Sequence, residues 1–130
     1  MPSHTMPLIS IVDDDLPVRR ALRRLIQAAG YTVETFASAR EFLDASPVGR
    51  TSCLVLDIHM DGMSGFELAE QLAADRAAIP IIFITAHDST PTRERARQAG
   101  VAGYLPKPFD ESALLDAIRG ALGVDHGRLD

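Results

Sequence analysis

Short apolar runs alternate with segments of helical periodicity along most of this chain of 130 residues. The apolar runs, of which all but the second are continuous, lie at Leu8–Val12, Thr32–Phe36, Cys53–Leu56, Ile81–Ile84 and Ala102–Leu105. Because parallel strands are joined by crossovers that usually contain a helix, this alternation predicts a parallel sheet with helices on both faces. The continuous runs are typical of strands covered on both faces, whereas the alternating second run is expected at an edge. The chain is therefore predicted to form an α/β domain of five strands and five helices.

Two of the expected helices begin with the pattern of a capping box. Ser38 is followed by Glu41, and Ser64 by Glu67. At this spacing, each hydroxyl and carboxylate can accept from the free N–H groups of a first helical turn. Asp15 stands two residues before Pro17 and is expected to cap the first helix, since acidic groups are favoured at helix N-termini.

The composition excludes several classes of protein. Acidic residues outnumber basic ones by 18 to 13 and neither half of the chain is basic, so the chain itself is not expected to bind nucleic acid. The longest apolar runs, such as Ile79–Thr85, are too short to cross a membrane. The N-terminus lacks the pattern of a signal peptide, and the single cysteine, Cys53, can build neither a disulfide framework nor a zinc site. We expect a cytoplasmic protein without membrane contact.

Polar side chains follow the strands at the edge where ligands bind in sheets of this kind. The first strand runs into Asp13–Asp15, the third into Asp57, the fourth into Thr85 and the fifth into Lys107. Because the carboxyl ends of parallel strands share one edge, these groups are expected to converge there. Lys107 is the only lysine among the 13 basic residues.

This combination of groups suits phosphoryl chemistry. Two like charges 4 Å apart repel by about 4 kcal/mol at an effective dielectric of about 20, so gathered carboxylates call for a cation. Mg²⁺ is commonly held by one or two carboxylates together with phosphate oxygens. A hydroxyl and an ammonium beside the metal would bind phosphoryl oxygens, and an aspartate can itself be the covalent acceptor. With Asp13 and Asp14 on the metal, Asp57 is the candidate nucleophile.

The sequence resembles a known family in four of its segments. Ile11–Asp15, Leu56–Met60, Phe83–Ala86 and Tyr104–Phe109 are similar to the receiver domain of bacterial two-component response regulators, and the resemblance extends over about residues 8–122. It implies a flavodoxin-like, doubly wound fold with strand order 2-1-3-4-5. The implied receiver domain occupies residues 8–123, with an N-terminal tail at 1–7 and a C-terminal tail or the start of a linker at 124–130.

The resemblance also implies a metal set and a phosphoacceptor. Asp57 matches the phosphoacceptor, and Asp13 and Asp14 match the acidic pair that, with Asp57, holds Mg²⁺ or another divalent cation such as Mn²⁺. His59 matches the position whose backbone carbonyl also binds the metal. The family usually has proline where this chain has Asp61, which adds a carboxylate near the metal and removes a rigid turn residue.

Further positions match the switch of the family. Thr85 and Lys107 correspond to the residues that contact the phosphoryl group, and Thr85 and Tyr104 to the pair that moves when it binds. The Lys107–Pro108 peptide is implied to be cis. His59 and His87 lie near the same edge, and we hypothesise that they control the access of water to the phosphoryl group.

Other segments resemble receivers that precede a helix-turn-helix DNA-binding domain. They are Pro17–Arg19, Phe36–Ala39, Gly62–Gly65 and Thr85–His87. The implied function is a phosphorylation-dependent switch that takes its phosphoryl group from a sensor histidine kinase, forms a homodimer, and regulates transcription through an output domain. Such a domain is a regulatory phosphoacceptor and not an enzyme. The alternative is a stand-alone receiver that acts by protein–protein contact.

Two unrelated functions are also considered. A phosphatase of the aspartyl-phosphate type would use the same nucleophile but usually carries a second acid two residues later, where this chain has His59. A flavin or dinucleotide module would need a glycine- or hydroxyl-rich loop after the first strand, where Asp13–Asp15 stand instead.

Overall fold

The predicted strands form one parallel sheet in a computed structural model that describes residues 6–45 and 49–123. The strands are β1 (Leu8–Val12), β2 (Thr32–Phe36), β3 (Cys53–Asp57), β4 (Ile81–Thr85) and β5 (Gly103–Pro106). They alternate with the helices α1 (Leu16–Ala28), α2 (Ala39–Ala45), α3 (Gly65–Ala74), α4 (Thr90–Gln98) and α5 (Glu111–Leu122). Within the described ranges, no helix is long and apolar enough to cross a membrane. The tails expected at 1–7 and 124–130 lie outside the described residues, except for positions 6 and 7.

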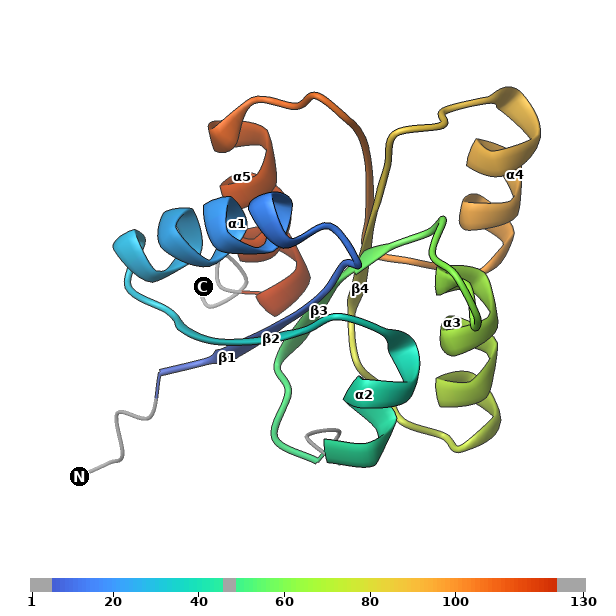
Figure 1. Cartoon of the computed structure of the whole chain (residues 1–130), viewed down its shortest axis with the longest axis horizontal. Coiled ribbons are helices and arrows are strands. Elements are labelled where there is room, and N and C mark those ends of the chain that lie inside the picture. Colours follow the sequence, from blue (N-terminus) through green and yellow to red (C-terminus); the bar gives the residue numbers. More distant parts are fainter. Residues whose placement is uncertain (1–5, 46–48, 124–130) are drawn as a thin grey trace.

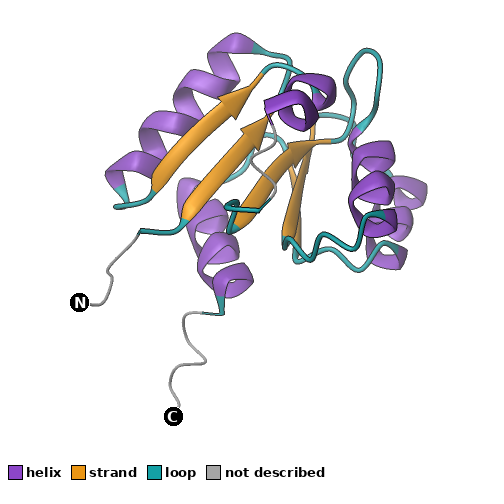
Figure 2. Cartoon of the chain, turned by 90° about the horizontal axis from the view of Figure 1, so that it is seen from below, coloured by secondary structure: helices purple, strands orange, loops and turns teal. Residues whose placement is uncertain are grey.

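The strand order is β2-β1-β3-β4-β5, and every neighbouring pair is parallel. The doubly wound fold, the strand order and the edge position of β2 are therefore confirmed. All the strands run the same way, so their carboxyl ends meet at one edge of the sheet (Figure 2). The pairing of Asp57 with Ile84 and of Thr85 with Pro106 carries β3 and β4 one residue beyond the predicted ends. Backbone pairing continues there because it does not depend on the polarity of the side chain.

Two apolar layers cover the sheet, one on each face. Helices α1 and α5 lie on one face and α2, α3 and α4 on the other (Figure 1). Successive side chains of a strand point to opposite faces, and β3 divides accordingly. Cys53 and Val55 pack in the layer with α1 and α5, whereas Leu54 and Leu56 pack in the layer with α2, α3 and α4. The continuous apolar strands are thus explained by burial from both sides.

Strand β5 departs from that expectation. Its apolar run predicts burial on both faces, but its residues, Gly103–Pro106, are only half-buried. The strand lies at the second edge of the sheet and pairs only with β4 among the described strands. It also begins one residue later than predicted. Tyr104 packs against the layer with α2, α3 and α4, whereas Leu105 packs against the layer with α1 and α5.

The two predicted capping boxes differ in their geometry. At α3, Ser64 accepts from the Glu67 backbone N–H at 3.1 Å and donates its own N–H to the Glu67 carboxylate at 2.8 Å, which completes the box. At α2, Ser38 accepts from the Glu41 N–H at 3.0 Å, but the Glu41 carboxylate accepts from Ala37 instead of Ser38. In the box at α2, the hydrogen bond to the Glu41 carboxylate is therefore shifted by one residue, from Ser38 to Ala37.

The complete box at α3 gives a test of local stability. Replacing Ser64 with Ala removes one N-cap hydrogen bond and is expected to lower the free energy of unfolding by about 1 kcal/mol, measured by urea denaturation. Ser64→Asp keeps an acceptor at the cap and is expected to retain most of this stability. Equal losses in the two variants would contradict the assignment of the cap.

Candidate functional site

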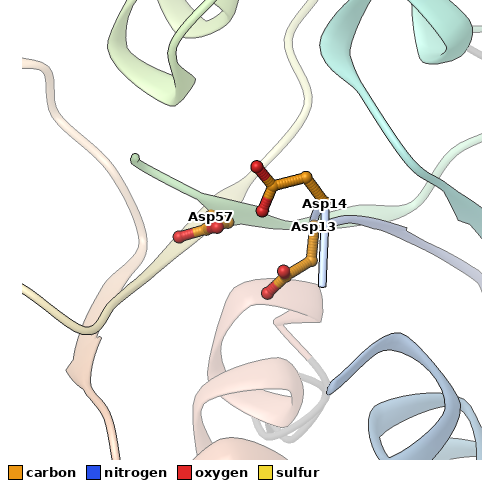
Figure 3. Close-up of side chains that lie close together, drawn as sticks. All are labelled: Asp13, Asp14 and Asp57. Carbon is orange, nitrogen blue, oxygen red and sulfur yellow. The ribbon is translucent and has the colours of Figure 1, made fainter. Parts of the chain in front are cut away.

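Three carboxylates meet where β1 and β3 end. Asp57 is the last residue of β3, and Asp13 and Asp14 directly follow β1, the strand beside it. One carboxylate oxygen from each residue lies within 4.8 Å of the other two, and Figure 3 shows the three side chains gathered at this edge. Asp13 and Asp57 are buried, whereas Asp14 is exposed. The three carboxylates of the predicted metal set are therefore brought together, and that of Asp14 is open to solvent.

The chain leaves its strand geometry immediately after β1, which lets both adjacent aspartates reach the same place. Within a strand they would point to opposite faces. A turn forms instead, in which the Asp13 carboxylate accepts from the Asp15 backbone N–H at 2.9 Å and Arg19 donates to the Asp13 carbonyl at 2.7 Å. Asp15 occupies the N-cap position of α1, but its side chain makes no capping hydrogen bond. The capping expected of Asp15 is thus limited to its position and charge.

Burial and repulsion make the charge on Asp57 costly. The pKa of its carboxyl is raised to about 6, first by burial and then by the negative charges of Asp13 and Asp14. The Lys107 ammonium and the His59 backbone N–H act in the opposite direction and favour the carboxylate form. Asp57 is therefore ionised at neutral pH but held in an unfavourable field, which a divalent cation would relieve.

Lys107 provides the positive charge of the site. Its ammonium donates to the Asp13 carboxylate at 3.1 Å and lies 3.9 Å from a carboxylate oxygen of Asp57. The residue follows β5, and its backbone N–H donates to the Thr85 carbonyl at 2.7 Å, which fixes the chain beside β4. The Lys107–Pro108 peptide is cis, as the family resemblance implies. One ammonium thus contacts two of the three carboxylates.

Thr85 ends β4 and is fully buried. Its hydroxyl oxygen accepts from the His87 backbone N–H at 2.9 Å and shares a hydrogen bond of 3.0 Å with Nδ1 of His59. The rings of His59 and His87 make an edge-to-face contact with centroids 5.0 Å apart. Partial burial, and secondarily His87, lower the pKa of His59. The contact between the His59 side chain and Thr85 is not predicted from the sequence, because only the His59 backbone carbonyl has a role in the expected metal set.

Tyr104 lies on β5 and is tied to the segment before α4. Its hydroxyl donates to Asp88 at 2.8 Å, and Asp88 also forms an ion pair with Arg93. Burial, and then the hydrogen bond to Asp88, raise the pKa of Tyr104. The sequence predicts that Tyr104 lies near the edge of the sheet where the strands end, but it does not identify its partners. Asp88 precedes α4 and Arg93 lies in the first half of that helix, and neither has a spacing that marks it out.

The loop after β3 returns close to the phosphoacceptor candidate. Gly65 donates its N–H to the Ile58 carbonyl at 2.8 Å, and a Cβ there would lie only 2.5 Å from the Asp57 carbonyl oxygen. Glycine is therefore required by close backbone approach. Asp61 is exposed, on the wall of a surface hollow that Asp14 and His59 also line, and it does not join the group of three carboxylates.

The residues present fit a hard divalent cation. Mg²⁺ prefers oxygen ligands and is usually held by one or two carboxylates. Asp13, Asp14 and Asp57 offer convergent carboxylate oxygens, and the single ammonium of Lys107 leaves their charge undercompensated. The donor set contains no thiolate, so it does not favour a soft metal.

The raised pKa of Asp57 predicts a pH-dependent stability in the absence of metal. Between about pH 4 and about pH 6 the folded chain retains a proton that the unfolded chain has released, so the free energy of unfolding falls as pH rises. The change in pKa from 3.8 to about 6 corresponds to about 3 kcal/mol. With a chelator present, Asp57→Asn is expected to be more stable than the wild type by about 2–3 kcal/mol at about pH 8, and about equally stable at about pH 4.

Urea denaturation of both proteins at the two pH values measures this difference. Asp61→Asn removes a charge from an exposed position outside the group and serves as the control, with no comparable gain expected. A wild type and Asp57→Asn that differ equally at both pH values would contradict the account.

Comparisons with known proteins agree on one family. Residues 9–119 match the family model of the response regulator receiver domain. Nodulation protein W of Bradyrhizobium diazoefficiens is 41% identical over 124 residues, which are 95% of this chain and 55% of that protein. Transcriptional regulatory protein FixJ of Azorhizobium caulinodans is 38% identical over 122 residues, 92% of this chain and 58% of FixJ. The solved structure of the response regulator StyR has a TM-score of 0.85 and 50% identity, and the match covers 95% of this chain and 62% of StyR. The chain spans little more than half the length of these curated relatives.

Proposed function

The chain belongs to the response regulator receiver domain family, and we propose that it is a phosphorylation-dependent switch of a two-component system, with Asp57 as the phosphoacceptor. The observation that carries this proposal is the position of Asp57, at the end of β3, facing two further carboxylates and the Lys107 ammonium. The proposed phosphodonor is a sensor histidine kinase. A flavin or dinucleotide module is set aside by the family membership.

The proposed reaction is a transfer from phosphohistidine to aspartate. A carboxylate oxygen of Asp57 attacks phosphorus, and the new O–P bond forms as the N–P bond breaks, with its electron pair left on the imidazole nitrogen. Asp57 acts in its ionised form, which predominates at neutral pH because its pKa of about 6 lies below that pH. In this proposal the chain is a regulatory phosphoacceptor that assists both its own phosphorylation and its own dephosphorylation. It is not proposed to be an enzyme that acts on other substrates.

A divalent cation completes the proposed site. Asp13, Asp14 and Asp57 would hold Mg²⁺, or another divalent cation such as Mn²⁺, through carboxylate oxygens, and His59 would contribute its backbone carbonyl. The bound cation would neutralise charge on the phosphoryl oxygens and on the carboxylates. We propose that Lys107, whose ammonium lies 3.9 Å from a carboxylate oxygen of Asp57, would bind a phosphoryl oxygen directly.

The proposed switch links the site to the surface around α4 and β5. A phosphoryl group on Asp57 would attract the Thr85 hydroxyl, and Tyr104 would move with it. Because Tyr104 is bonded to Asp88, and Asp88 to Arg93 on α4, its movement would alter the surface of that helix. We propose that this change promotes a homodimer through α4, β5 and α5.

The output is proposed from the relatives. FixJ is a transcriptional regulatory protein by name, and this chain matches 58% of its length. We propose that the receiver occupies residues 8–123 and that 124–130 are a C-terminal tail or begin a linker. DNA would then be bound only by an output domain outside this chain. The proposed location of the protein is the cytoplasm, without membrane contact. A stand-alone receiver that acts by protein–protein contact is the alternative.

Intact-mass measurement tests the phosphoacceptor. With acetyl phosphate and Mg²⁺, the wild type is expected to gain one phosphoryl group, and excess chelator is expected to prevent the gain. Asp57→Asn is expected to gain none, because an amide lacks the nucleophilic carboxylate. Asp15→Asn changes a neighbouring carboxylate outside the group of three and is the matched control, with normal uptake expected. Uptake by Asp57→Asn would refute the assignment.

A further inference from the structure

The hydroxyl group of Thr85 already has a hydrogen-bond donor and a possible acceptor beside it. Thr85 is 0% exposed, so bulk water does not reach it. Among the described residues, its hydroxyl oxygen has two polar partners, the backbone N–H of His87 at 2.9 Å and Nδ1 of His59 at 3.0 Å. A threonine hydroxyl can donate one hydrogen bond and accept two.

These partners determine where the hydroxyl proton goes. The His87 N–H can only donate, so it occupies one lone pair of the Thr85 oxygen. The His59 Nδ1 is then the one acceptor available to the hydroxyl proton within the described part of the chain. If Nδ1 carried a proton of its own, the oxygen would receive two donors and its buried O–H would have no acceptor, which is costly. The favoured arrangement has the Thr85 hydroxyl donating to Nδ1.

The position of His59 explains why it can make this contact. It follows β3 by two residues, and Thr85 ends β4, the neighbouring strand. The edge-to-face contact with His87, 5.0 Å between ring centroids, supports the ring over the end of β4. His59 is an exposed residue, so its ring can move aside without opening the core.

We propose that the His59 side chain is a positioning residue that holds the Thr85 hydroxyl proton in the unphosphorylated chain and thereby opposes the switch. This inference rests on the proposed function, in which Thr85 donates to a phosphoryl oxygen on Asp57. One proton cannot be donated fully to both acceptors, so the phosphoryl group must displace the His59 Nδ1 as the acceptor of the Thr85 hydroxyl proton. A charged phosphoryl oxygen is the stronger acceptor, so the exchange is favourable. The free energy gained is smaller than it would be without His59, because the hydrogen bond to Nδ1 is lost.

Beryllofluoride, a phosphoryl analogue that is not hydrolysed, measures this competition at equilibrium. With saturating Mg²⁺, His59→Ala is expected to bind beryllofluoride about three- to tenfold more tightly than the wild type, the worth of about one hydrogen bond. His59→Asn carries an amide oxygen close to the position of Nδ1, which can accept the hydroxyl proton instead. Its affinity for beryllofluoride is therefore expected to stay within about twofold of that of the wild type. Separate titration with Mg²⁺ alone verifies that cation binding is saturated in each protein.

A double-mutant cycle distinguishes this role from a general effect on the loop. In a Thr85→Val background, which lacks the hydroxyl, His59→Ala is expected to leave beryllofluoride affinity unchanged. Equal or weaker binding by His59→Ala in the wild-type background would overturn the inference, as would a gain that persists with Thr85→Val. If the wild type itself bound neither beryllofluoride nor a phosphoryl group from acetyl phosphate, the proposed function would fail as well.

Nitrogen NMR of the wild type gives a test that needs no variant. The His59 Nδ1 resonance is expected to be that of an unprotonated, hydrogen-bonded nitrogen, and to move away from that position when beryllofluoride is added, because the Thr85 hydroxyl then donates to the analogue. A protonated Nδ1 in the free protein, or a resonance that does not move although beryllofluoride binds, would overturn the inference while leaving Asp57 as the phosphoacceptor.

Discussion

Repulsion among three carboxylates at one edge of the sheet is the constraint on which the site depends. Asp57 is almost entirely buried at the end of β3, and its pKa is raised to about 6 by burial and by its acidic neighbours. A single ammonium, from Lys107, offsets part of this charge through contacts of 3.1 Å with Asp13 and 3.9 Å with Asp57. Such an arrangement costs stability, so it marks a place where charge is held ready for a ligand.

The parallel sheet makes this gathering of charge possible. Its strands deliver their last residues to one edge, and the two apolar layers keep β1, β3 and β4 in a fixed register. The turn after β1 brings Asp13 and Asp14 to the same place, and the cis peptide after Lys107 belongs to the segment that returns beside β4. The rigid part of the fold thus sets the distances, while the residues proposed to move lie on its rim.

Much of this could be predicted from the sequence because periodicity and strand ends carry the information. The strand order, the edge strand β2 and the convergence of Asp13, Asp14 and Asp57 all follow from those signals and the family resemblance. The half-buried state of β5 could not be predicted, because an apolar edge strand has the same sequence pattern as a central strand. Neither could the bond between His59 and Thr85, since side-chain orientation in a loop has no periodic signature.

We propose that a buried and only partly compensated charge on Asp57 prepares the site for a divalent cation. Carbon NMR of the Asp57 carboxyl group, titrated with and without Mg²⁺, tests it most directly. Without metal, the pKa is expected to be near the value of about 6 that burial and the neighbouring carboxylates produce, and saturating Mg²⁺ is expected to lower it well below that. A metal-free pKa at the ordinary value for aspartate, or one that Mg²⁺ leaves unchanged, would contradict the account.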